Sequence, residues 1–324
     1  MNMSISNGAA AAREQARRQD GKFGHQPHAE AEVDLGSAPD DKSWRQAWSE
    51  AFTMTASPER LRELSHHGNL RVRVAVANNP STTADVLENM AGDENGEVRF
   101  LVAAHPRTSP KVLHDLAQDE YPDIRQQIAK SKRLNNSTFE MLAQDPDKRV
   151  RGELAQNQNT PKHLLTRLAK DEERWVVNFA ATNPHTPPAA LLELADSEDA
   201  EMQRVIALSS VNPRVLTTLA SSSNPFTRAA VAVNPKTPTA TAFILASDED
   251  PAVRWSLAEE TKDAKILELL AEDNEPRIRQ AVATNRHAGA GALAKLADHP
   301  ELRDSVSWHP NTTPEILEKM GYAL

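Results

Sequence analysis

Arginine recurs along this chain at a nearly constant spacing of 24 to 26 residues. The series consists of Arg73, Arg99, Arg125, Arg151, Arg228, Arg254, Arg279 and Arg303, and Val177 and Gln203 stand where two further members would fall. A row of guanidinium groups at one pitch can do two kinds of chemistry. It can contact successive phosphates of a nucleic acid, or it can pair with the protein's own carboxylates, and an aspartate lies six residues before most of these arginines.

Histidines near the junctions of the repeated units raise the question of a metal site. His105 and His309 share a column of the repeat that otherwise holds Asn79, Asn183, Asn234 and Asn285, so we expect all of them to form hydrogen bonds at a helix end. Histidines on different units would lie about 10 Å apart, which is too far for one metal ion. We therefore expect no metal.

The chain offers no catalytic pattern. It contains no cysteine, which excludes disulfides, thiolate nucleophiles, iron–sulfur clusters and cysteine-ligated zinc. The repeated aspartates are explained as helix caps, so no carboxylate pair is assigned to acid–base chemistry, and no Ser/His/Asp triad follows from the spacing. We expect no enzymatic activity and no cofactor.

Three aromatic residues are candidate anchors for a partner. Phe100 and Trp255 directly follow an arginine of the series, and Trp308 lies five residues after Arg303. The position directly after the arginine, which Phe100 and Trp255 occupy, holds different residue types in different units. Positions that vary in this way usually face solvent. The alternative is that these aromatic rings lean against the neighbouring unit.

Each unit must consist of two helices that position these side chains. The first begins at an asparagine or aspartate N-cap such as Asn95, four residues before the arginine, and often has proline at its first position, as at Pro225. Valine and isoleucine flank the arginine at four-residue spacing and form one buried stripe. A proline such as Pro106 then ends the helix.

The second helix is predicted to open at a Thr-Pro or Thr-x-Pro sequence such as Thr108 to Pro110, where threonine or its neighbour caps the helix. Its buried face carries a leucine pair three residues apart, such as Leu113 and Leu116. Near the two missing arginines, Ser210 is expected to replace the usual proline, and Val211 to Leu216 forms a shortened connection where the stack could bend or loosen.

The repeated pattern V-R-x-x-V-A-x-N-P-x-T-P-x-x-V-L-x-x-L-A-x-D resembles the leucine-rich repeat variant, a bacterial helical repeat related to HEAT repeats. The best copies are Val98 to Asp119 and Arg228 to Asp248. The resemblance implies an all-α, right-handed solenoid of about ten to eleven repeats of 24–26 residues, with one helix of each pair short or 3₁₀-like. It also implies a structural ladder of Asp and Arg side chains that bridges neighbouring units, and an interaction module with no common enzymatic activity. The cysteine cluster that binds iron and sulfur in some members is missing.

Composition divides the chain into an arm and a repeat region. Residues 1–40 are poor in large apolar side chains and are predicted to be a disordered arm. Residues 41–324 form the repeats, with an imperfect N-terminal cap at residues 41–65. Neither a membrane-spanning run nor the apolar part of a secretory signal is seen, so we expect a soluble, cytoplasmic protein.

These observations favour a scaffold that binds a protein partner of unknown identity through an extended surface. The acidic turns along one edge suggest a basic segment as that partner. The formal charge of −9 argues against nucleic acid. The second candidate is a nucleic-acid-binding or base-processing protein, which would need the arginines to face a groove. A third is a rigid spacer whose arm carries recognition. The oligomeric state is left open.

Overall fold

The computed structural model describes residues 43–322, and the predicted arm at residues 1–40 lies outside this part of the chain. The chain divides into two units, residues 1–50 and 51–324. The helix α2 (Ser43–Phe52) spans the division, and every other described helix belongs to the second unit. Within residues 43–322 all regular structure is helical, so the fold is an all-α solenoid.

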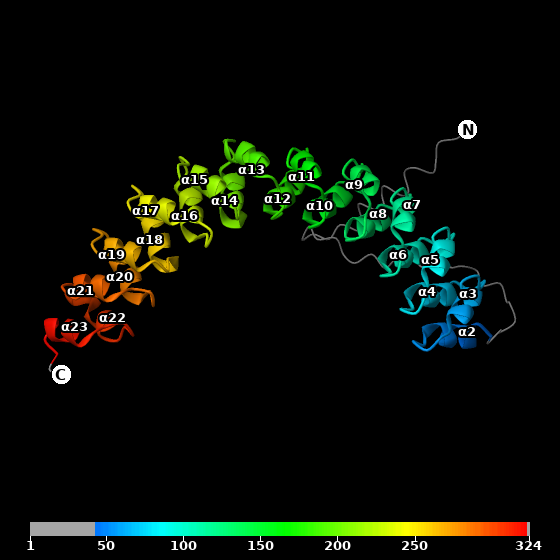
Figure 1. Ribbon diagram of the computed structural model, residues 1–324, viewed down its shortest axis with the longest axis horizontal. Coiled ribbons are helices and arrows are strands. Elements are labelled where there is room, and N and C mark those ends of the chain that lie inside the picture. Colours follow the sequence, from blue (N-terminus) through cyan, green and yellow to red (C-terminus); the bar gives the residue numbers. More distant parts are fainter. Residues whose placement is uncertain (1–42, 323–324) are drawn as a thin grey trace, which may run out of the picture. The chain divides into compact units, whose positions relative to one another are not determined.

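The helices of the second unit form two rows (Figure 1). The even-numbered helices, here called the A row, carry the arginine series. They are α4 (Leu70–Asn78), α6 (Gly96–Ala104), α8 (Pro122–Ala129), α10 (Lys148–Gln156), α12 (Arg174–Thr182), α14 (Ala200–Ser209), α16 (Pro225–Val233), α18 (Pro251–Glu260), α20 (Pro276–Thr284) and α22 (Arg303–Ser307). Each contacts the next in the row, from α4 to α22.

The odd-numbered helices form the B row. They are α3 (Pro58–Leu64), α5 (Ala84–Met90), α7 (Pro110–Leu116), α9 (Asn136–Leu142), α11 (Lys162–Leu168), α13 (Pro188–Ala195), α15 (Pro213–Leu219), α17 (Thr239–Leu245), α19 (Ala264–Leu270), α21 (Ala290–Leu296) and α23 (Pro314–Lys319). One helix of each pair is the shorter, as the resemblance implied: most B helices have seven residues and most A helices nine or more, and both kinds are α-helices. The 3₁₀ helix found within residues 43–322, η1 (Pro300–Leu302), precedes α22 in the A row.

Capping starts the A helices where the sequence predicts. The side chain of Asn95 accepts a hydrogen bond from the Glu97 N–H at the start of α6, and Asp147 and Asp250 do the same for α10 and α18. Proline occupies the first turn of α16, as predicted for Pro225. Most A helices have only nine residues, so they depend on packing against neighbouring helices as well as on their caps.

The core lies between the two rows. Val98 and Val102 of α6 are fully buried, and so is Leu113 of α7, the B helix of the same repeat. One continuous cluster of buried side chains runs from Val177 to Met320. Because each layer meets only its neighbours, the apolar core extends along the stack instead of gathering at one centre.

The threonine of the Thr-Pro sequence does not itself cap the B helix; in α7 its neighbour does, which is the other residue that we predicted for this role. Thr108 is fully buried, and its hydroxyl donates to the carbonyl of Val102, six residues earlier at the end of α6. Ser109 caps α7 instead. The threonine thus satisfies a carbonyl that the end of the A helix would leave unpaired. The same bond recurs at Thr82, Thr160, Thr186, Thr237 and Thr312.

The prediction for Ser210 was wrong. Ser210 is the C-cap of α14 and holds the column of the asparagines, and its carbonyl accepts from Asn234 at 3.0 Å. Only three residues, 210–212, join α14 to α15, because α14 is extended to ten residues and Asn212 caps α15 directly. The helix α14 contacts both α12 and α16, so the A row continues through this repeat.

Candidate protein-binding surface

The arginines of the A row form buried pairs with aspartates of the following repeat. Arg99 donates from Nε to Asp119 Oδ2 at 2.6 Å and from Nη2 to Asp119 Oδ1 at 3.2 Å. Its Nη1 donates to the carbonyl of Asp93 at 2.8 Å. Asp93 in turn accepts from Arg73 through its carboxylate. Each aspartate therefore holds one arginine by its side chain and the next by its backbone.

We call each such pair a rung. Six rungs have this two-point geometry: Arg73–Asp93, Arg99–Asp119, Arg125–Asp145, Arg151–Asp171, Arg228–Asp248 and Arg254–Asp273. Their arginine side chains are only 9–16% exposed. Hydrogen bonding to Asp248 raises the pKa of Arg228. Burial, the largest influence, acts to raise the pKa of Asp248, but the hydrogen bonds from Arg228 and the Asp250 backbone and the charges of Arg228 and Arg254 together lower it.

The two missing arginines leave different structures. Gln203 forms a neutral rung: its Nε2 donates to the carbonyl of Ser197 at 2.8 Å, and its Oε1 accepts from the Ser222 hydroxyl at 2.6 Å. Ser222 stands where the aspartate would, and it still accepts the Asn224 N–H. Val177 is a buried apolar side chain that supplies no donor. One position therefore keeps the bonding pattern without charge, and the other loses it.

The C-terminal arginines depart from the pattern because their aspartates are absent. His299 stands where Arg279 would find a carboxylate, so Arg279 reaches Glu301 at 3.3 Å and its buried Nε has no hydrogen-bond partner. The guanidinium of Arg303 stacks on the ring of Tyr322, 5.5 Å from its centroid. All eight arginines of the series thus contact the chain itself.

The asparagine column forms a second row of bonds between repeats. Asn79 donates from Nδ2 to the carbonyls of Ala51 and Thr53, and its Oδ1 accepts the Ser81 N–H. His105 reproduces this pattern: its Nε2 lies 3.0 Å from the Asn79 carbonyl oxygen, and its Nδ1 accepts the Arg107 N–H at 3.1 Å. Burial lowers the pKa of His105.

His309 makes the matching contacts with the carbonyl of Asn285 and the N–H of Asn311. These bonds use both ring nitrogens of each histidine. Within residues 43–322 no cluster of three or more acidic or histidine side chains is placed to hold a metal ion. No helix in that range is long and apolar enough to span a bilayer.

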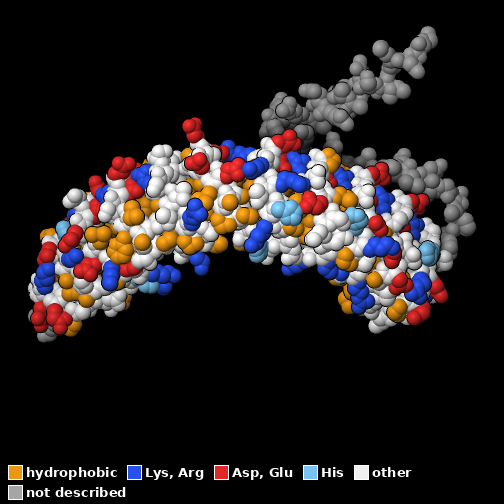
Figure 2. All heavy atoms as spheres, turned by 45° about the horizontal axis from the view of Figure 1, so that its top comes forward, with side chains coloured by type: hydrophobic (Ala, Val, Ile, Leu, Met, Phe, Trp, Pro, Cys, Tyr) orange, Lys and Arg blue, Asp and Glu red, His pale blue; other side chains and the backbone are white. Residues whose placement is uncertain are grey.

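The outer side of the A row, here called the A face, changes character along the chain. In its N-terminal part, exposed charges pair across repeats, as in Arg149–Asp123 at 2.8 Å and Lys148–Glu173 at 3.0 Å. From α14 onward large apolar side chains are exposed, among them Leu208 on α14 and Phe226 on α16. Figure 2, in which the B-row side of Figure 1 comes forward, shows further hydrophobic side chains gathered over the stretch from α13 to α19.

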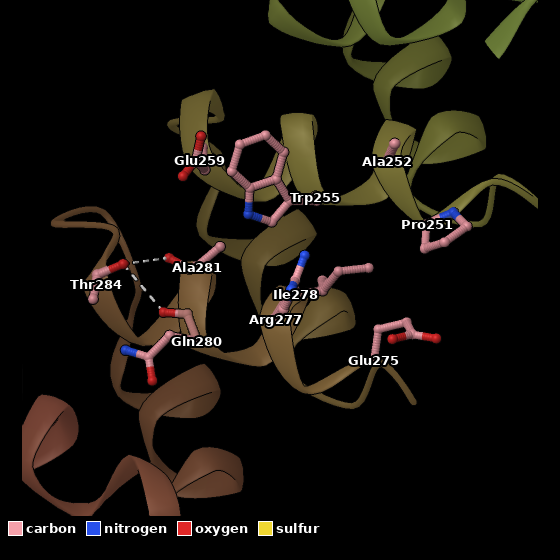
Figure 3. Close-up of a pocket in the computed structure, with 10 residues that line it drawn as sticks. All are labelled: Pro251, Ala252, Trp255, Glu259, Glu275, Arg277, Ile278, Gln280, Ala281 and Thr284. Atoms are coloured by element: carbon pink, nitrogen blue, oxygen red, sulfur yellow. Dashed lines mark hydrogen bonds between the residues drawn. The ribbon is translucent and has the colours of Figure 1, made fainter. Parts of the chain in front are cut away.

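An apolar groove of about 620 Å³ lies between α18 and α20 on this face (Figure 3). Trp255 of α18 lies along one side, and Arg277 of α20 extends toward its indole ring. The hydroxyl of Thr284 is engaged with the carbonyls of Gln280 and Ala281. The lining consists of Pro251, Ala252, Trp255, Glu259, Glu275, Arg277, Ile278, Gln280, Ala281 and Thr284.

Three charged side chains of this groove are unpaired. Glu259, Glu275 and Arg277 are exposed and form no hydrogen bond or ion pair through their side chains with any residue of the described range. Elsewhere on the A face, exposed charges such as those of Arg149 and Lys148 have partners in the neighbouring repeat. The groove therefore combines an apolar lining with charges that can bind a ligand.

The three predicted anchors do not form one site. Their side chains are exposed, at 37% for Phe100, 41% for Trp255 and 87% for Trp308. Trp255 lines the groove, whereas Phe100 lies on α6, six A helices away, and Trp308 lies at the end of α22. Sequence reasoning missed Phe226, although it occupies a column as variable as that of Trp255, two residues before the arginine.

Comparison with known proteins supports no assignment beyond the fold. No protein-family profile matches the chain, and no curated protein matches it. Among solved structures, the chain is similar to a leucine-rich repeat variant with a novel repetitive structural motif, at 21% identity and a TM-score of 0.48, covering 68% of this chain and 88% of that one. An engineered protein matches at 16% identity and a TM-score of 0.24, covering 88% and 85%. Computationally designed armadillo repeat proteins for modular peptide recognition match at 13% identity and a TM-score of 0.13, covering 81% and 91%.

Proposed function

We propose that this chain is a non-enzymatic scaffold that binds another protein through the apolar part of the A face, from α14 to α20. The observation that carries the proposal is the exposure of large apolar side chains there, with Phe226 71% exposed. Burying such a side chain against a partner contributes about 1.5–3 kcal/mol. Aromatic side chains beside a groove are typical centres of protein interfaces.

The alternative of nucleic-acid binding is not favoured. The arginines that would contact phosphates are largely buried and face carboxylates or an aromatic ring of the same chain. Freeing one of them would break a buried ion pair, which costs about 3–5 kcal/mol. The net charge of −9 adds a repulsive field.

The test compares capture by the full chain with capture by two single variants. Phe226→Ser removes an apolar side chain from the A face, and Ile244→Ser removes a side chain of similar exposure, 66%, from the B helix α17. We expect a protein that is retained from nuclease-treated host extract by the wild type and by Ile244→Ser, and is lost with Phe226→Ser. Equal retention by all three, or retention that nuclease abolishes, would overturn the proposal.

A further inference from the structure

The groove between α18 and α20 has a defined length and a defined charge at each end. Pro251 and Glu275 lie at its start, and Glu259 and Thr284 lie at its end. Nine residues of α-helix separate Glu275 from Thr284, which corresponds to about 13 Å at 1.5 Å per residue. An extended peptide covers about that distance in four residues, at 3.3 Å each.

Glu275 lies at one end of this length and Glu259 at the other, so an extended segment that fills the groove would bring side chains four residues apart near the two carboxylates. In an extended chain, positions i, i+2 and i+4 point to the same side. The middle position would then face the apolar lining beside Trp255, where an aromatic ring gains edge-to-face or offset contact with the indole. The unpaired guanidinium of Arg277 can donate to backbone carbonyls of the same segment.

Charge complementarity selects the sign of the flanking residues. Glu259 and Glu275 line the groove, and Arg277 is the single cation in its lining. The net negative charge attracts a segment with positive side chains and repels one with acidic side chains.

We propose that this groove binds an extended polypeptide segment with the pattern basic-x-aromatic-x-basic, its outer cations on Glu275 and Glu259 and its aromatic residue against Trp255. This inference rests on the proposed function and names the chemistry that the partner presents. The segment is recognised by alternate side chains on one side of its backbone, so moving the aromatic residue by one position turns it away from the groove.

The experiment uses the full chain and a fluorescein-labelled peptide, Gly-Lys-Ser-Phe-Ser-Lys-Gly, with binding followed by fluorescence anisotropy. Two control peptides place the aromatic residue next to the first lysine or replace both lysines by glutamate. The protein variants are Glu259→Gln, Glu275→Gln and Trp255→Ala. Glu260→Gln is the matched control, because Glu260 is also exposed at the end of α18 but does not line the groove.

We expect the first peptide to bind the wild type and Glu260→Gln equally. Each glutamine variant of a groove carboxylate should weaken binding about threefold at low salt, and less at high salt, as for exposed ion pairs. Trp255→Ala should weaken binding about tenfold or more. Both control peptides should bind the wild type with lower affinity than the first peptide.

Equal binding of the charge-reversed peptide, or equal effects of Glu259→Gln and Glu260→Gln, would overturn the inference. So would failure of the peptide to bind a correctly folded wild-type chain, as verified by circular dichroism. These results leave the proposed function standing if Phe226→Ser still abolishes capture of a protein. The proposed function itself would be refuted if Phe226→Ser captured the protein as well as the wild type.

Discussion

Replacing Arg228 by Gln should destabilise the chain far more than making the same replacement together with Asp248→Ser. In the single variant the carboxylate of Asp248, with its side chain 7% exposed, loses its two-point partner and stays buried. Such an uncompensated charge costs about 3–5 kcal/mol. The double variant reproduces the neutral rung that Gln203 and Ser222 already form one repeat earlier, where the hydroxyl and amide satisfy each other at 2.6 Å. We expect it to lose only about 1 kcal/mol, because neutral hydrogen bonds replace charge-assisted ones while no charge is left unpaired.

The assay is urea unfolding followed by circular dichroism, with amide hydrogen exchange of α16 and α18 as a local readout, because repeats can open separately. Asp248→Ser alone completes the double-mutant cycle and should resemble Arg228→Gln, since it leaves the guanidinium buried. Single losses of about 3–5 kcal/mol each and a double loss of about 1 kcal/mol correspond to a coupling between the two positions of about 5–9 kcal/mol. If the double variant is no more stable than either single variant, the rung is held by its charge and not by the matching of buried groups, and our reasoning is wrong.

Three further predictions concern individual contacts. Gly152→Ala should destabilise α10 by about 1–3 kcal/mol, because a Cβ there would lie 2.1 Å from the Trp175 ring; urea unfolding checks this, and a gain in stability would mean that the ring moves freely. Thr108→Val should cost about 1–2 kcal/mol in the same assay by leaving the Val102 carbonyl unpaired, whereas an unchanged midpoint would show that this bond contributes nothing. Burial lowers the pKa of His105, so the unfolded chain takes up a proton first and stability should fall as the pH drops below the ordinary value of 6.5; His105→Asn should reduce this slope in urea midpoints measured between about pH 7 and 5, and an identical slope in both proteins would count against the assignment.

Most helix boundaries could be predicted because their causes are local. An N-cap such as Asn95 and a first-turn proline such as Pro225 act within a few residues of the backbone that they stabilise. The repeat period could be predicted for a related reason, since each copy must bury the same stripe against its neighbours. The role of Thr108 could not, because the end of one helix and the start of the next lie within the same six residues. A hydroxyl at that position could bond either to the last turn of the first helix or to the first turn of the second.

Candidate site residues were harder to predict because their grouping depends on distant parts of the chain. A variable column indicated that Phe100 and Trp255 are exposed, and both are. It could not indicate that Trp255 alone of the three predicted anchors lines a groove, because the opposite wall comes from α20, in the next repeat. Phe226, Glu259 and Arg277 carried the same kind of signal, a position on the outward side of an A helix, and they were overlooked.

The sequence by itself determined that the chain is a stack of helical pairs, because capping, proline restriction and apolar spacing act over a few residues and repeat with one period. Only the tertiary structure decided which charged side chains are paired within the chain and which are left unpaired. Arg228 and Arg277 are both arginines of A helices, yet one is buried against Asp248 and the other is unpaired in the groove. That difference arises from side chains about 20 residues away or on the next helix, and their positions are set by the packing of neighbouring repeats.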